Sequence, residues 1–323
     1  MSNENNVIDY DGKWKVIIEE LFEDFIQFFM PDLYPLIDFT KKVTFLKQDI
    51  PKIAGSSKKK GDKIKDNIVE VHLKNGEQRL VLIHIEIQAT SEKDFAERMF
   101  VYYYRTRDKY KRKIAAIAIY VGASKPKIHD YFQESFGNTE ISYRFNSYNV
   151  KDPNEKELLA NKNPFAIVVL ACKYILTSTS DYEKRIKLKI KLVELAKKRN
   201  YGEQKIVALV SFVMNLMILP QKYEQKFVAY ILKPYQKSKE MVFTQLDKML
   251  LDGMVRGVYG ETIDQMLERL RLEAEEERLK AEEERLKAIT RLLKLAVLTD
   301  KQIANIYEVP LNYVQSIKKE NNL

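Results

Sequence analysis

The chain is poor in cysteine, glycine and proline. Its one cysteine, Cys172, excludes an internal disulfide, and the apolar neighbours of that residue predict a buried thiol rather than a nucleophile. Ten glycines and nine prolines stand against abundant Lys, Glu, Ile and Leu in 323 residues. This balance favours a helix-dominated protein over a β-sandwich.

The sequence also lacks a long apolar run and a targeting segment. The longest uncharged apolar stretches, 114–123 and 165–172, are far shorter than a bilayer span. The polar opening, 1–6, has neither the basic start nor the apolar core of a signal peptide. We therefore expect a cytoplasmic protein with no membrane partner.

Positive charge is in moderate excess, +9 overall, and it is unevenly placed. Lysines gather in 58–65, and a second group of Lys and Arg lies in 105–113. Such groups suit the phosphates of a polyanion such as DNA. They are equally common on solvated surfaces, so both interpretations stand.

The most informative segments are 66–72 and 81–88, which read as two strands around an Asn75-Gly76 turn. A period of two places Glu86 and Gln88 on the face away from the aliphatic row of the second strand. The hairpin register then decides which face Asp66 occupies. A two-residue loop would put Asp66 opposite Ile85, with the two acids on different faces.

A three-residue loop, or one bulge, would instead pair Asp66 with Glu86 and Ile68 with His84. In this register, which we expect, one face is wholly apolar. The other face carries Asp66, Glu70, His72, His84, Glu86 and Gln88. Two apposed carboxylates cost energy unless a proton or cation lies between them, and hard oxygen ligands favour Mg²⁺ or Mn²⁺.

These residues carry a family resemblance. Asp66 followed after nineteen residues by Glu86-Ile87-Gln88 resembles the Asp…Glu-x-Lys signature of PD-(D/E)XK nucleases, with Gln in place of Lys. Segments 82–88 and 94–105 are similar to the recombination-promoting nuclease (Rpn, YhgA-like transposase) family of that superfamily. The resemblance covers roughly 10–175 and implies Mg²⁺-dependent DNA cleavage in recombination or mobile-element processes.

The resemblance also implies roles for individual residues. Asp66 and Glu86 would hold the metal, and Glu20 on the first helix would add a ligand, unless it is an ordinary surface acid. Gln88 would orient water or phosphate. Because an amide supplies no cation, Lys93 or Arg98 from the next helix is expected to replace the usual Lys.

The predicted helix after Gln88 carries one mixed stripe. Arg98, Tyr102, Arg105 and Lys109 follow at i+3 and i+4 spacing, so with Lys63 and Lys65 they form the expected DNA-binding set. For Tyr102, core packing explains the position equally well. His84 reads as a structural histidine, since no further nitrogen or sulfur ligands stand at zinc spacing.

The expected fold is α/β: a small, mixed, restriction-endonuclease-like sheet flanked by helices, then an all-α region with a long charged helix. We expect a nuclease-like core at 1–177, a helical region at 178–257, the long helix at 258–298 and a helix-turn-helix-like hairpin at 299–323. Expected helices are 13–29, 91–110, 155–161, 164–177, 181–199, 203–218, 222–233 and 237–250, and expected strands beyond the hairpin are 113–121 and 141–145.

The tail leaves its partners open. Leu272, Leu279, Leu286 and Leu293 recur every seven residues, but polar residues precede them, so only half of a coiled-coil seam exists. This argues against a strong zipper and leaves a weak homodimer through the long helix open. The terminal hairpin would be a DNA reader or a hairpin that only packs. For the whole chain, the alternatives are a nonhydrolytic DNA-binding module and a helical scaffold.

Overall fold

A computed structural model describes residues 10–46, 67–86, 92–122, 130–236 and 245–321. The chain divides into two compact units, Met1–Leu246 and Asp247–Leu323. The expected boundary between the core and the helical region, 177/178, therefore falls inside the first unit. None of the helices within the described ranges is both long and apolar enough to cross a membrane.

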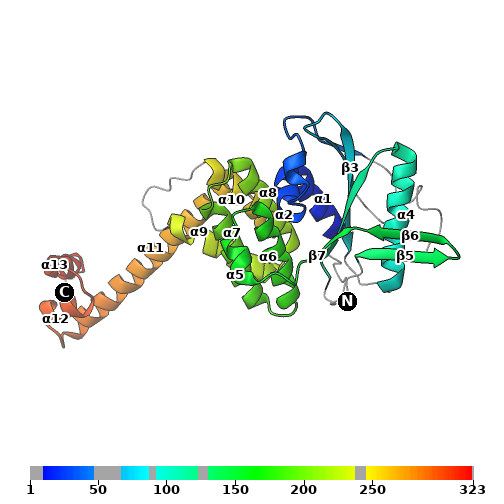
Figure 1. The fold of residues 1–323 in the computed structure, drawn as a ribbon. Helices are drawn as coiled ribbons and strands as arrows, with labels where there is room; N and C mark the ends of the chain where they lie inside the picture. Colours follow the sequence, from blue (N-terminus) through cyan, green and yellow to red (C-terminus); the bar gives the residue numbers. More distant parts are fainter. Residues whose placement is uncertain (1–9, 47–66, 87–91, 123–129, 237–244, 322–323) are drawn as a thin grey trace. The chain divides into compact units, whose positions relative to one another are not determined.

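The first unit contains a five-stranded mixed sheet (Figure 1). Its order is β1 (Thr44–Leu46), β2 (Asn67–His72), β3 (Gln78–Glu86), β4 (Ile114–Tyr120) and β7 (Asn146–Asn149). The pairs β1–β2 and β2–β3 are antiparallel, whereas β3–β4 and β4–β7 are parallel. Helix α4 (Glu92–Tyr110) connects β3 to β4, as a parallel pair requires. The predicted 91–110 helix and 113–121 strand are confirmed.

Both faces of the sheet are covered by helices. On one face, Leu80 and Leu82 pack in a core with Phe95 and Met99 of α4. On the other face, helix α2 (Phe22–Phe29) contacts β1 and β7 through aromatic rings. These contacts are Phe22–Phe45 at 5.5 Å and Phe29–Tyr148 at 4.8 Å between centroids. Strand β4 is apolar along its length because it lies between two such layers.

The fourth expected strand takes a different place. Strand β6 (Thr139–Arg144) pairs with β5 (Tyr131–Phe136) in a separate two-stranded ribbon, and β7 completes the main sheet. The alternation that predicted a strand at 141–145 is correct, but Tyr143 and Phe145 pack in the core on the α4 side of the sheet. A strand in the main sheet and a strand in a separate ribbon would both bury Tyr143 and Phe145. The alternation in the sequence therefore could not distinguish the two arrangements.

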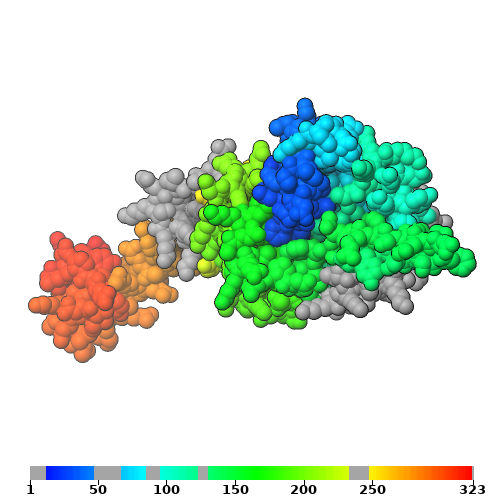
Figure 2. Space-filling view, in the orientation of Figure 1, coloured from blue at the N-terminus to red at the C-terminus, as the bar shows by residue number. Residues whose placement is uncertain are grey.

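Helix α1 (Tyr10–Glu20) and α2 replace the single helix expected at 13–29, because Leu21 leaves the helical conformation at φ −125° and ψ 39°. A short 3₁₀ turn, Tyr34–Leu36, follows. The other helices of this unit lie close to their expected positions. They are α5 (Glu155–Ala160), α6 (Pro164–Thr177), α7 (Tyr182–Lys198), α8 (Glu203–Leu216) and α9 (Gln221–Gln236). Figure 2 shows the N-terminal helices, in blue, against the green helices from the middle of the chain.

The second unit is helical. It comprises α10 (Gln245–Tyr259), α11 (Ile263–Leu295), α12 (Asp300–Ile306) and α13 (Leu311–Glu320). The helix expected at 237–250 is described only from 245, and it continues to Tyr259. Thr262 and Thr299 form capping boxes that start α11 and α12. Ala296, at φ 51°, ends α11 in the left-handed conformation.

Candidate functional site

The β2–β3 hairpin differs in register from the sequence prediction. Leu73 and Glu77 close a three-residue loop, with Leu73 N donating to Glu77 O at 2.8 Å. Gly76 takes φ +85°, which favours glycine. Ile68 therefore pairs with Leu82, not with His84 as expected. The loop length was right, but the loop begins one residue earlier, so each pairing moves by two residues.

A register shift of two residues leaves each side chain on the same face of the sheet. The face that was expected to be polar, however, is not exposed to solvent. Ile68, Leu80 and Leu82 are buried at 0–1% exposure and pack against α4. His84, 6% exposed, lies 5.4 Å from the ring of Phe95. The expectation of one wholly apolar and one acidic face was therefore wrong in this part of the hairpin, because helices bury both sides of the sheet.

The acids at this end of the hairpin lie largely outside the described residues. Asp66, Gln88, Lys63 and Lys65 are not described, and for Glu86 only the main chain is: it ends β3 and pairs with Tyr120. Within the described ranges, no three His, Cys, Asp or Glu side chains gather as a metal centre would need. The metal site thus stays a prediction.

Among the other proposed polar residues that are described, Glu70 has a structural partner. Glu70, farther along β2, forms an ion pair with Arg112 after α4. His72, near the hairpin turn, is only partly exposed. Glu20 is exposed on α1, and its role as a ligand stays a prediction.

Helix α4 presents its expected stripe in two parts. Tyr102 is 4% exposed and belongs to the core cluster, as the packing alternative predicted. Arg98 lies with its guanidinium carbon 5.5 Å from the centroid of Phe95. Arg105 is partly exposed, and Lys109 is exposed with its ammonium 5.3 Å from the ring of Tyr110. Arg105 and Lys109 therefore lie towards the surface, whereas Arg98 is half-buried with its Nε inside the protein and the phenol of Tyr102 is packed on the sheet.

The structure brings together a second polar site that the sequence did not indicate. A surface pocket of about 610 Å³ lies between α2 and the segment that joins α5 to α6. Its wall includes Asp24, Phe28, Tyr148, Asn163 and Tyr201. These residues come from four separate parts of the chain, so no local spacing could have predicted the pocket.

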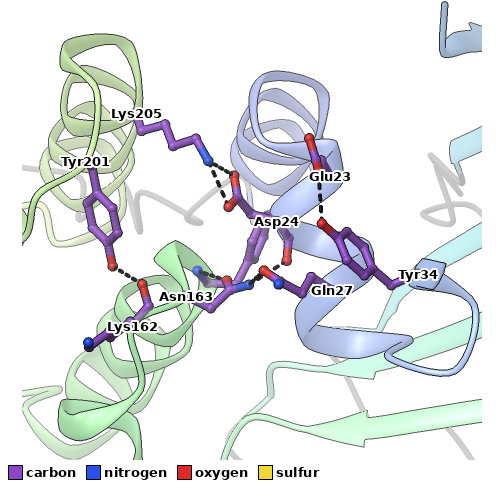
Figure 3. Close-up of polar contacts among 9 residues, drawn as sticks. Glu23, Asp24, Gln27, Tyr34, Lys162, Asn163, Tyr201 and Lys205 are labelled. Atoms are coloured by element: carbon purple, nitrogen blue, oxygen red, sulfur yellow. Dashed lines mark hydrogen bonds and ion pairs between the residues drawn. The ribbon is translucent and has the colours of Figure 1, made fainter. Parts of the chain in front are cut away.

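Asp24 and Lys205 form the central contact of this site (Figure 3). Lys205 Nζ lies 2.8 and 2.7 Å from the two carboxylate oxygens of Asp24. A carboxylate is usually exposed on a helix surface, but Asp24 is buried at 9% exposure. It is buried because α8 packs beside α1 and carries Lys205 to it.

Asn163 links the same helix to the next segment. Its Nδ2 donates to Asp24 O at 3.0 Å and to Gln27 Oε1 at 3.2 Å, while its Oδ1 accepts from Phe165 N at 2.8 Å as the N-cap of α6. Tyr201 OH donates to Lys162 O at 2.7 Å, and burial raises the pKa of this phenol. The polar groups of the pocket thus bond to one another, and their evident role is to join α2, α6 and α8.

Comparisons of the chain with models of protein families, with curated proteins and with solved structures give no match.

Proposed function

We propose that the chain is a Mg²⁺-dependent DNA endonuclease of the PD-(D/E)XK type, acting in the cytoplasm in recombination or mobile-element processes. The observation that supports this is the connection of the three central strands. β3 pairs antiparallel with β2 and leads through α4 into the parallel strand β4. Strand, strand, helix, strand is the order of a restriction-endonuclease-like core, and β2, which begins directly after Asp66 in the sequence, pairs with β3, which ends at Glu86.

The main chain is compatible with a shared metal. Asp66 is one peptide bond from Asn67, which pairs with Ile83, and Glu86 lies three residues farther along β3. The carboxylates of Asp66, directly before β2, and of Glu86, the last residue of β3, suit the hard cation Mg²⁺, with Mn²⁺ as a substitute. When bound, the metal would lower the pKa of a water and offset charge on the phosphate. Asp66 and Glu86 are the ligands in this proposal, with Glu20 as an additional one.

The surrounding residues divide the remaining tasks. Gln88 orients water or phosphate through its amide, and Arg98 supplies the cation that the amide lacks, because guanidinium matches phosphate geometry. Lys63, Lys65, Arg105 and Lys109 hold the DNA backbone. Tyr102 is buried, so in this proposal it holds α4 against the sheet and does not contact DNA.

Two alternatives belong to other classes. A nonhydrolytic DNA-binding module is favoured by Gln88, since loss of the usual Lys removes a catalytic cation. A helical interaction scaffold would use α11, on which Leu272, Leu279 and Leu286 are 58%, 55% and 38% exposed. The same leucines would serve a homodimer of the nuclease.

Nicking of supercoiled plasmid tests the proposal. Full-length protein should convert plasmid to open circle with Mg²⁺ and not with EDTA, and Glu86→Gln should abolish this conversion. Glu97→Gln is the matched control, because Glu97 is an exposed carboxylate on α4 to which we assign no role. Unchanged nicking by folded Glu86→Gln protein would contradict the proposal.

The variant Asp66→Ala tests whether the proposed metal site is needed for nicking but not for folding. Removal of one of two neighbouring acids relieves repulsion, so the variant should fold normally and lose nicking. If the full-length protein binds plasmid in EDTA but does not nick it with Mg²⁺, the nonhydrolytic module is favoured. Absence of both binding and nicking would favour the scaffold.

A further inference from the structure

The last two helices form a compact unit with the end of α11. Ile289 and Leu293 of α11 are buried together with Ile303 of α12 and with Val314 and Ile317 of α13. All five are at most 8% exposed. Three short helical segments around one apolar centre, shown in orange and red in Figure 1, hold α13 in a fixed orientation.

The turn between α12 and α13 is tight and well bonded. Glu308 adopts φ 49°, the left-handed position that a glycine often fills in such turns. Val309 N donates to Ala304 O at 3.0 Å, and Pro310 precedes the first residue of α13. A short turn of this kind between two packed helices is the geometry of a helix-turn-helix.

The outer side of α13 carries one chemical pattern. Asn312, Gln315, Ser316 and Lys319 stand at i, i+3, i+4 and i+7 and are all exposed. They lie opposite the buried side formed by Val314 and Ile317. Ser316 Oγ donates to Tyr313 O at 2.8 Å, so its oxygen keeps the capacity to accept.

Every member of this stripe suits the edge of a base, and none is a carboxylate. Asn and Gln pair bidentately with adenine, Lys with guanine, and Ser with either donors or acceptors. Over 285–321, seven Lys and Arg accompany three Asp and Glu, which suits contact with phosphates. Apolar or acidic side chains would be expected on a helix that reads a basic or hydrophobic partner.

We propose that α13 enters the major groove of DNA and that Asn312, Gln315, Ser316 and Lys319 read base edges there. The inference shares with the proposed function only the premise that DNA is the partner, and it requires neither a metal nor cleavage. The chain then carries sequence preference in a unit separate from its chemistry. Leu311, 40% exposed next to Asn312 on α13, and Ile306, 58% exposed at the end of α12, make a protein partner the competing occupant.

Selection from random DNA duplexes tests this. Full-length protein in EDTA, where cleavage is stopped, should enrich a short motif, and Asn312→Ala/Gln315→Ala should lose about tenfold or more of the preference for it. Gln225→Ala, an exposed amide on α9 in the other unit, is the matched control and should retain the motif. Thermal unfolding should be unchanged in both, because the altered side chains are exposed.

A salt titration distinguishes base reading from backbone contact. Lys319→Ala should weaken binding and reduce the slope of log affinity against log salt by about one. The proposal is overturned if no motif is enriched, if the double variant keeps the motif, or if it weakens all duplexes equally. Metal-dependent nicking without an enriched motif would support the proposed nuclease and contradict base reading by α13. An enriched motif without nicking would support base reading and contradict the nuclease.

Discussion

Lys205 reaches across 181 positions of sequence to hold both carboxylate oxygens of Asp24, at 2.8 and 2.7 Å. The contact joins α2, which packs on the sheet, to α8 in the helical part of the same unit. The two partners differ in exposure: the side chain of Asp24 is 13% exposed and that of Lys205 is 43% exposed. This difference sets the expected cost of removing each one.

We expect Lys205→Met to destabilise the protein more than Asp24→Asn. The first change leaves a carboxylate buried without its cation and should cost about 1–3 kcal/mol. The second leaves a lysine that reaches water, so after screening it should cost about 1 kcal/mol or less. Denaturant unfolding of both variants and of the double variant measures the coupling, with exposed Lys187→Met as the control. Equal effects would contradict this prediction.

The pair Lys189–Glu224 is the most buried ion pair among the described residues. Lys189 is 0% exposed, with Nζ 2.7 and 2.9 Å from the Glu224 oxygens and 4.8 Å from the ring of Phe227. We expect Glu224→Gln to cost about 3–5 kcal/mol, because it leaves a buried ammonium without its counterion. Lys189→Met/Glu224→Gln should recover most of this loss in denaturant unfolding. No recovery would show that packing, not charge, is responsible.

The same pair predicts a pH dependence. Burial lowers the pKa of Lys189 below its ordinary 10.5, and Glu224 opposes this shift. Between the lowered folded pKa and 10.5, the unfolded chain binds more protons, so the free energy of unfolding rises with pH in that window. This pH range, in which the free energy of unfolding rises, should be wider for Glu224→Gln and absent for Lys189→Met. Unfolding measured from pH 7 to 10 checks this, and identical slopes in the three proteins would contradict it.

Cys172 should be unreactive in the native protein. Burial raises the pKa of its thiol from 9.0 to about 12. The thiolate fraction at pH 8 therefore falls about a thousandfold, and access is blocked as well. As the one cysteine of the chain, it can be followed directly with a thiol-specific colour reagent in native and denatured protein. Fast labelling of native protein would contradict this prediction and would show that the structure around Cys172 opens to solvent.

Gln88→Lys should retain or raise cleavage if the proposed function holds. An ammonium adds charge stabilisation in the transition state that an amide lacks. Single-turnover rates on plasmid, compared at equal metal concentration, measure this. A complete loss in a folded variant would mean that Gln88 makes a contact specific to its amide.

Several elements could be predicted because their causes are local. The Asn163 cap and Pro164 fix the start of α6, and its apolar run marks burial on all sides. Thr299, with Gln302 three residues later, fixes the start of α12, and the apolar residues spaced along 303–317 form the core of this unit. The three-residue length of the β2–β3 loop followed from the aliphatic pattern of the two strands, and Gly76 takes the positive φ in that turn.

Other features depended on partners distant in the chain. The hairpin loop could start at either of two positions, and only burial of Leu80 and Leu82 beneath α4 selects the observed register. Tyr102 has the same spacing whether it faces DNA or the sheet, and the packing of α4 decides for the sheet. Asp24 looks like a surface acid until α8 brings Lys205 to it.

The sequence by itself thus determined the start of helices such as α6 and α12, because caps and apolar periodicity act within a few residues. It also determined which residue types are available for chemistry, including the Asp66 and Glu86 motif and the polar stripe of α13. The tertiary structure alone decided which faces are buried, which charges are paired and which stripe stays exposed. These outcomes depend on burial against elements up to 181 positions away, and no local pattern encodes that distance.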